Sequence, residues 1–157
     1  MTNRRALIGV IDDDAAVLRA LSRLLMAWNY DVRAFGSVEA FLAEPGWEFR
    51  EDRHLDCLVV DVHMLGLSGL ELQSEPSVIR ARLPIVFVTG AGDASLRDRA
   101  MADGAVEFLQ KPFTDDQLIR AIDRALDMKS QGCLEPSDFH GASVSRIDSP
   151  TRRNVCW

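Results

Sequence analysis

Short apolar runs alternate along this chain with segments whose apolar residues recur at helical spacing. Four mostly apolar runs cover residues 6–11, 57–61, 84–88 and 106–110. Uninterrupted runs of this length are typical of strands buried on both faces, as in a parallel sheet. Residues 31–35 alternate between polar and apolar types, which predicts a fifth strand near an edge.

Helix-period segments separate and follow these strands. Asp14 is placed to cap a first helix and Thr114 a last one. Helices are also predicted after residue 37, near 94–103, and over about 69–82, where Pro76 interrupts the pattern. Five strands alternating with five helices predict an α/β fold, a doubly wound parallel sheet with helices on both faces. The carboxyl ends of its strands then share one edge, where such sheets bind ligands.

Composition limits the class of protein. The chain has 157 residues, 47% of them hydrophobic, enough for one domain with a core. No apolar run approaches the ~18–20 residues that cross a bilayer, and the first residues lack a signal-peptide core. The net charge of −6 disfavours direct DNA binding. Cys57, Cys133 and Cys156 lack metal-site spacing. We expect a cytoplasmic protein with no membrane contact.

The character of the sequence changes near residue 130. Residues 131–157 are rich in Ser, Gly and Pro and show neither helical nor strand periodicity. This predicts a domain over residues 1–130 and a largely unstructured C-terminal tail over residues 131–157.

Chemistry-bearing residues follow several of the predicted strands. Asp12 and Asp13 end the first, Asp61 the third, Thr89 the fourth, and Lys111 follows the fifth. Three neighbouring carboxylates resist ionising together, and Mg²⁺ relieves that repulsion. A carboxylate beside Mg²⁺ can attack phosphorus to give an aspartyl phosphate, with a lysine balancing the charge. The set predicts a site for phosphoryl transfer.

Each residue also has an ordinary structural interpretation. Acidic residues favour helix N-termini, and a threonine before a glycine often forms a turn. A strand aromatic such as Phe108 is usually a core residue. The order in which all of these residues occur favours the site.

Four stretches resemble one known family. VIDDDAAVLRAL, LVVDVHMLGLSGLEL, PIVFVTGAGD and GAVEFLQKPF are similar to the receiver domain of bacterial two-component response regulators. The resemblance covers about residues 6–127 and is to the subgroup that precedes a LuxR-type DNA-binding domain, typified by nitrogen-fixation regulators. It implies a flavodoxin-like strand order of 2-1-3-4-5.

The resemblance implies residue roles at the acidic end of the sheet. Asp61 corresponds to the phosphoacceptor. Asp12 and Asp13 correspond to the pair that holds Mg²⁺ together with Asp61. The backbone carbonyl of His63 would add a further metal ligand.

The resemblance also implies a switch. Thr89 and Lys111 correspond to the residues that contact the phosphoryl group, Phe108 to the rotating aromatic residue, and Pro112 to a cis-proline. A sensor histidine kinase or phosphotransfer protein would be the donor. The face formed by the helix near 94–103, strand 106–110 and the last helix would then control dimerisation or partner binding. The chain would not be an enzyme beyond its own phosphorylation and dephosphorylation.

Some features depart from the family pattern. Leu65 stands where the family usually has proline, and Pro76 falls inside a helix. Residues 131–157 are too few and too irregular for a helix-turn-helix output domain, so a stand-alone receiver, a phosphorelay shuttle and a shortened regulator all stay open. A non-phosphorylated binding module on the same fold is one alternative. A haloacid-dehalogenase-like phosphatase is another, although His63 stands where such enzymes have a second aspartate.

Overall fold

The computed structural model describes residues 4–45, 47, 54–63, 69–90 and 94–132. Its centre is a five-stranded parallel sheet in the order β2-β1-β3-β4-β5. The strands are β1 (Leu7–Ile11), β2 (Asp31–Phe35), β3 (Cys57–Asp61), β4 (Ile85–Thr89) and β5 (Glu107–Gln110). The predicted fold class and strand order are confirmed, and the alternating strand β2 is at an edge.

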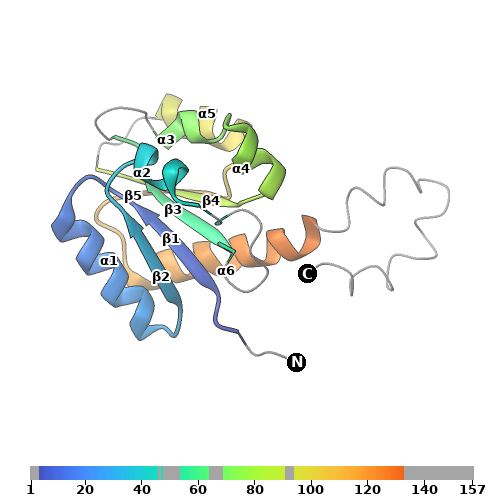
Figure 1. Cartoon of the computed structure of the whole chain (residues 1–157). Helices are drawn as coiled ribbons and strands as arrows, with labels where there is room; N and C mark the ends of the chain where they lie inside the picture. The colour runs from blue at the N-terminus through green and yellow to red at the C-terminus, as the bar shows by residue number, and fades with distance from the viewer. Residues whose placement is uncertain (1–3, 46, 48–53, 64–68, 91–93, 133–157) are drawn as a thin grey trace.

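Helices cover both faces of the sheet (Figure 1). One face carries α1 (Ala15–Ala27) and α6 (Asp115–Gly132). The other carries α2 (Val38–Ala43), α3 (Gly69–Leu72), α4 (Pro76–Ala81) and α5 (Ala94–Ala102). This arrangement is the doubly wound architecture that the alternating pattern predicts.

The central position of β3 in the sheet explains why its sequence is apolar up to Asp61. Cys57 and Val59 pack into the core beneath α1 and α6, whereas Leu58 and Val60 pack into the core on the opposite face. All residues of β3 are buried. Cys57 is a core residue, as its apolar run predicts. Its burial raises the pKa of the thiol, which keeps the thiol protonated.

Pro76 changes the helix count from the predicted one. The segment expected to be a single interrupted helix is two helices, α3 and α4, so the described residues contain six helices instead of five. Pro76 occupies the first turn of α4, where a missing N–H has no partner to lose. The departure at Leu65 lies outside the described residues.

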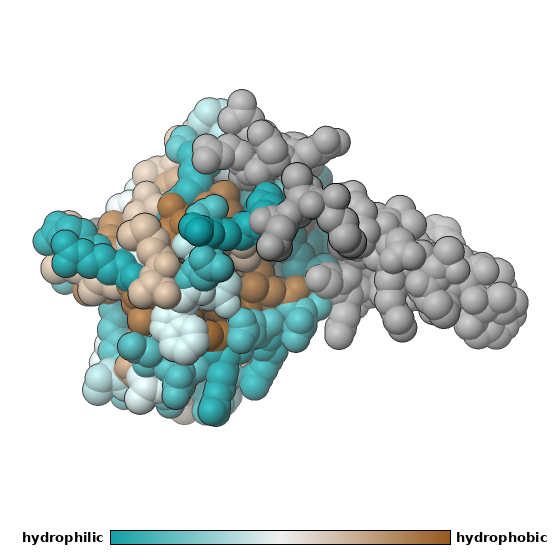
Figure 2. All heavy atoms as spheres, turned by 90° about the horizontal axis from the view of Figure 1, so that it is seen from below, coloured by the Kyte–Doolittle hydropathy of each residue, from teal (hydrophilic) through white to brown (hydrophobic). Residues whose placement is uncertain are grey.

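The last helix runs beyond the expected domain boundary. α6 begins after Thr114, as predicted, and ends at Gly132. The predicted tail from residue 133 onward, including Cys133 and Cys156, lies outside the described residues. Hydrophilic residues cover much of the described surface in the view from below, with smaller apolar patches between them (Figure 2). None of the described helices is both long and apolar enough to span a bilayer.

Candidate functional site

The parallel sheet gathers the predicted site residues at its carboxyl edge. Asp12 follows β1, and Asp61 is the last residue of the neighbouring strand β3. Thr89 ends β4, the next strand along, and Lys111 directly follows β5. Residues separated by up to 99 positions in sequence thus meet at one edge.

Three carboxylates form a compact cluster at this edge. One oxygen from each of Asp12, Asp13 and Asp61 lies within 4.8 Å of the others. Asp12 is 1% exposed and Asp61 is 7% exposed, so two of the three charges are largely removed from water. Asp13 is exposed and leaves the cluster open to solvent on its side.

The surroundings of Asp61 disfavour its charge. Burial is the largest cause that raises the pKa of Asp61 above its usual range. The carboxylates of Asp12 and Asp13 raise it further. The hydrogen bond from the His63 backbone and the charge of Lys111 lower the pKa of Asp61, but they do not reverse the shift. The ionised side chain is therefore held in a place that would favour a bound cation.

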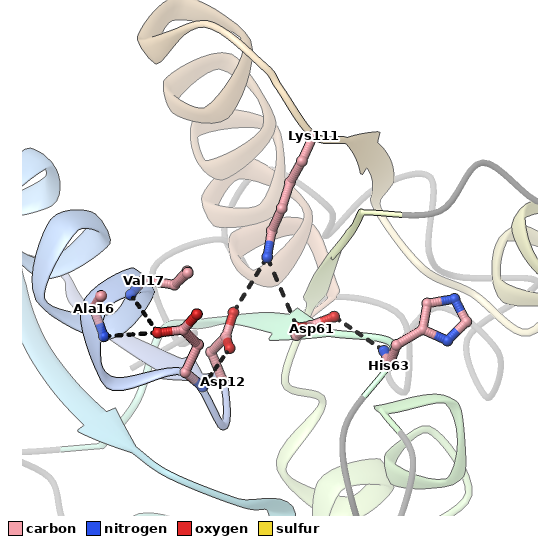
Figure 3. Close-up of polar contacts among 7 residues, drawn as sticks. Asp12, Ala16, Val17, Asp61, His63 and Lys111 are labelled. Atoms are coloured by element: carbon pink, nitrogen blue, oxygen red, sulfur yellow. Dashed lines mark hydrogen bonds and ion pairs between the residues drawn. The ribbon is translucent and has the colours of Figure 1, made fainter.

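A single lysine reaches into the cluster. Lys111 Nζ lies 3.4 Å from Asp12 Oδ2 and 3.8 Å from Asp61 Oδ2. Figure 3 shows its side chain descending from the end of β5 to a point between these two carboxylates. The Lys111–Pro112 peptide bond is cis, as the resemblance implies.

Backbone N–H groups fix the two buried carboxylates in the same way. Asp12 Oδ1 accepts a hydrogen bond from Asp14 N at 2.9 Å, and Asp61 Oδ1 accepts one from His63 N at 3.0 Å. In both cases the donor is two residues farther along the chain, the pattern of an Asx turn. Sequence reasoning missed this role of positions 14 and 63, although an aspartate at the end of a strand is a signal for it.

Of the other roles predicted at positions 14 and 63, the structure confirms the one at position 14. Asp14 caps α1 as predicted, since its carboxylate accepts hydrogen bonds from Ala16 N and Val17 N. The His63 ring points away from Asp61 (Figure 3). The metal-binding role of the His63 carbonyl stays a prediction.

Thr89 lies at the carboxyl edge of the sheet, whereas Phe108 lies in the core. Thr89 is fully buried at the end of β4, and its carbonyl accepts a hydrogen bond from Lys111 N at 2.7 Å. Phe108 is 9% exposed and packs in the core, with its ring centroid 6.3 Å from that of Phe87. The structure thus ties Thr89 to the lysine and places Phe108 farther inside.

The donor set fits a hard divalent cation. The cluster offers oxygen ligands only, and one of its three residues, Asp13, is exposed. Mg²⁺ prefers oxygen ligands and retains several waters. Asp12, Asp13 and Asp61 are therefore the described residues that could hold such an ion.

A comparison with known protein families identifies the family of this chain. The model of the response regulator receiver domain matches residues 8–123. The chain belongs to the response regulator receiver family. Receiver domains are components of two-component signalling, so the acidic edge belongs to a signalling domain.

Named relatives support this assignment. The transcriptional regulatory protein FixJ of Bradyrhizobium diazoefficiens is 43% identical over 120 residues, which cover 76% of this chain and 56% of FixJ. Nodulation protein W of the same organism is 39% identical over 118 residues, covering 75% of this chain and 50% of that protein. The chain spans about half the length of the curated relatives it matches.

A solved structure agrees with the fold. The crystal structure of a response regulator receiver domain protein from Clostridium thermocellum matches with a TM-score of 0.71 and 30% identity. The match covers 80% of this chain and 98% of that one. The receiver fold therefore accounts for most of the present chain.

Proposed function

We propose that this receiver domain is a phosphorylation switch in which Asp61 accepts a phosphoryl group. The observation that carries the proposal is the position of Asp61, which belongs to the carboxylate cluster and also faces Lys111 at the same edge. The donor is the phosphohistidine of a sensor histidine kinase or of a phosphotransfer protein. The cluster supplies the negative ligands and Lys111 the positive charge that phosphoryl transfer needs.

The transfer itself is a displacement at phosphorus. A carboxylate oxygen of Asp61 attacks the phosphorus and forms an O–P bond while the P–N bond of the phosphohistidine breaks. The imidazole nitrogen keeps the electron pair of that bond and takes up a proton from solvent. The product is an acyl phosphate on Asp61 and a neutral histidine on the donor.

The residues of the cluster orient the acceptor. The His63 N–H holds Asp61 Oδ1, which leaves Oδ2 on the side of Lys111 as the attacking oxygen. Asp12 and Asp13 would hold Mg²⁺ together with Asp61. When bound, the ion neutralises charge on the phosphoryl oxygens.

Phosphorylation then shifts a conformational equilibrium. The phosphoryl group adds roughly −1.5 to −2 charges, which attract Lys111 and the hydroxyl of Thr89. Phe108, which is buried on the strand next to Thr89, is the aromatic residue that repacks in response. Phosphorylation thereby stabilises one form of the α5–β5–α6 face over another.

The output is a surface and not a reaction on another substrate. The α5–β5–α6 face controls dimerisation or the binding of a partner protein, and the only chemistry is on the chain itself. A phosphatase of the haloacid dehalogenase type needs a general acid two residues after its nucleophile. Here that residue is His63, whose ring points away from Asp61 (Figure 3).

Treatment with acetyl phosphate and Mg²⁺ tests the proposal. The P–O bond of acetyl phosphate breaks, acetate leaves, and wild-type protein should gain one phosphoryl group by intact mass. Asp61→Asn should gain none, and Asp56→Asn, which alters a buried carboxylate at the other end of β3, should behave as wild type. A change in elution on size exclusion would report dimerisation. Labelled Asp61→Asn would reject the acceptor assignment, and unlabelled wild type would favour a non-phosphorylated binding module.

A further inference from the structure

The residue that begins α3 has no side chain and lies against the proposed acceptor. Gly69 is buried. A Cβ atom built on Gly69 would lie 2.8 Å from the carbonyl oxygen of Asp61 and 2.9 Å from Val60 Cγ1, both on β3. It would also lie 3.3 Å from Phe87 Cε1, a tight contact but not an impossible one. Real Cβ atoms essentially never approach another heavy atom closer than 3.0 Å. Any side chain at this position must therefore displace the end of β3 or the start of α3.

The backbone conformation does not account for this glycine. Among the described glycines, Gly104 is the one with a positive φ, at 102°. Gly69 is outside that region, so other residues could adopt its backbone angles. Glycine is also a poor helix former, and its presence at the start of α3 has no local advantage. The close contact with β3 is the remaining physical reason for it.

We infer that Gly69 is a positioning residue for Asp61, an inference that rests on the proposed phosphoryl transfer. The absence of a side chain lets α3 begin directly against the Asp61 carbonyl, so that the helix supports the acceptor from one side. Val62, the residue after Asp61, donates its N–H to the carbonyl oxygen of Val88 on the neighbouring strand β4 at 3.0 Å. The backbone around Asp61 is thus held by a helix and by β4 together.

The nature of the contacting atom determines the effect of a substitution. A backbone carbonyl cannot rotate away as a flexible side chain can. The clash is relieved when either Asp61 or the start of α3 that supports it moves, and we infer that the Asp61 carboxylate, which lies within 4.8 Å of two others, shifts with it. Misplacement of a reacting group by about 1 Å can reduce a rate by about 100-fold. The Val60 contact differs, because truncating that side chain removes it.

Gly69→Ala is the test, with Gly36→Ala as the matched control. A Cβ on Gly36 meets no atom within 4 Å, and Gly36 has no positive φ. The measured quantity is the rate of phosphorylation by acetyl phosphate at saturating Mg²⁺, at a temperature where urea titration shows each variant fully folded. We expect at least a tenfold loss for Gly69→Ala and a rate within twofold of wild type for Gly36→Ala.

A second variant separates positioning from crowding of the core. Gly69→Ala combined with Val60→Ala removes the contact with the Val60 side chain but keeps the contacts with the Asp61 carbonyl and with Phe87. Its rate should stay at least tenfold below that of Val60→Ala alone, since the contact with the Asp61 carbonyl is still present. If Gly69→Ala does not fold, this pair decides.

Two results would overturn the inference. One is a Gly69→Ala rate equal to that of Gly36→Ala, which would leave glycine with a purely structural role. The other is a normal rate in the double variant, which would assign the loss to the Val60 side chain. If wild type itself takes no phosphoryl group, the proposed function fails first, so the two failures are distinguishable.

Discussion

The two ends of strand β3 each hold a buried aspartate near cations, and they use it differently. At the amino end, both oxygens of Asp56 have partners. Oδ2 accepts a hydrogen bond from Leu7 N at 2.8 Å, and Oδ1 lies 3.0 Å from the Arg4 guanidinium and 3.2 Å from His54 Nε2. The Asp56 carboxylate thus links β3 to the start of β1 and to the residues just before it.

At the carboxyl end, Asp61 is held much less completely. Oδ1 accepts a backbone hydrogen bond, but Oδ2 faces Lys111 at 3.8 Å, beyond hydrogen-bond distance. Two other carboxylates lie near it. The comparison teaches that burial alone does not identify a functional aspartate. What distinguishes Asp61 is incomplete compensation together with neighbours of the same charge.

The largest effect on stability should come from a substitution at the amino end of β3, where the Asp56 carboxylate has partners at both oxygens. Asp56→Ala leaves the buried Leu7 N–H without its acceptor and removes the partner of Arg4. We expect a loss of about 2–4 kcal/mol in the free energy of unfolding, measured by urea titration. The phosphorylation rate of the folded protein should not change, because this end is remote from the acidic edge.

Asp56→Asn is the control for this prediction. Its carbonyl oxygen can still accept from Leu7 N, so it should lose clearly less stability than Asp56→Ala. Equal losses in both variants would show that the charge of Asp56, and not the hydrogen bond to Leu7, is what matters. A reduced phosphorylation rate in folded Asp56→Ala would break the separation between the two ends.

Divalent ions should stabilise the protein by binding at the carboxyl end of β3, where Asp61 lies, and not at the amino end. Mg²⁺ at 100 times its Kd should raise the free energy of unfolding of wild type by about 2.7 kcal/mol, because it binds only the folded cluster. Thermal unfolding with and without Mg²⁺ measures this. Asp13→Asn should lose most of the effect and Asp56→Asn should keep it. Equal stabilisation of all three proteins would mean that the ion binds elsewhere.

Most of the fold follows from local patterns in the sequence. The bounds of β3 agree with the predicted strand at both ends, since its run is apolar on both faces and stops at a charged residue. Convergence of Asp12, Asp61 and Lys111 also follows, because parallel strands end at one edge. These features need only periodicity and topology.

Other features depend on distances between segments that no local pattern encodes. Pro76 signals an interruption, but whether it kinks one helix or begins another depends on packing against the sheet. The contact between Gly69 and the Asp61 carbonyl joins two elements, and a glycine in a turn-rich stretch does not reveal it. The Asp56 partners Arg4 and Leu7 likewise come from a stretch about fifty positions earlier in the chain.

The smallest expected effect is the stability change caused by the charge of Asp61. Its carboxyl pKa is raised in the folded protein, so the native state keeps its proton to a higher pH than the unfolded chain does. Unfolding then releases a proton between the ordinary value of about 3.9 and the raised native pKa. Within that window the stability of wild type falls as pH rises, and it stays reduced above the window.

Asp61→Asn cannot titrate and should escape this loss. With a chelator present, it should match wild type below pH 4 and be the more stable of the two at pH 7, because only wild type then carries the disfavoured charge. Urea titrations of both proteins across this range measure the difference. A difference that does not change with pH would show that Asp61 carries no strained charge. In that case the contrast between the two ends of β3 would rest on geometry alone, because Asp61 would be as well compensated as Asp56.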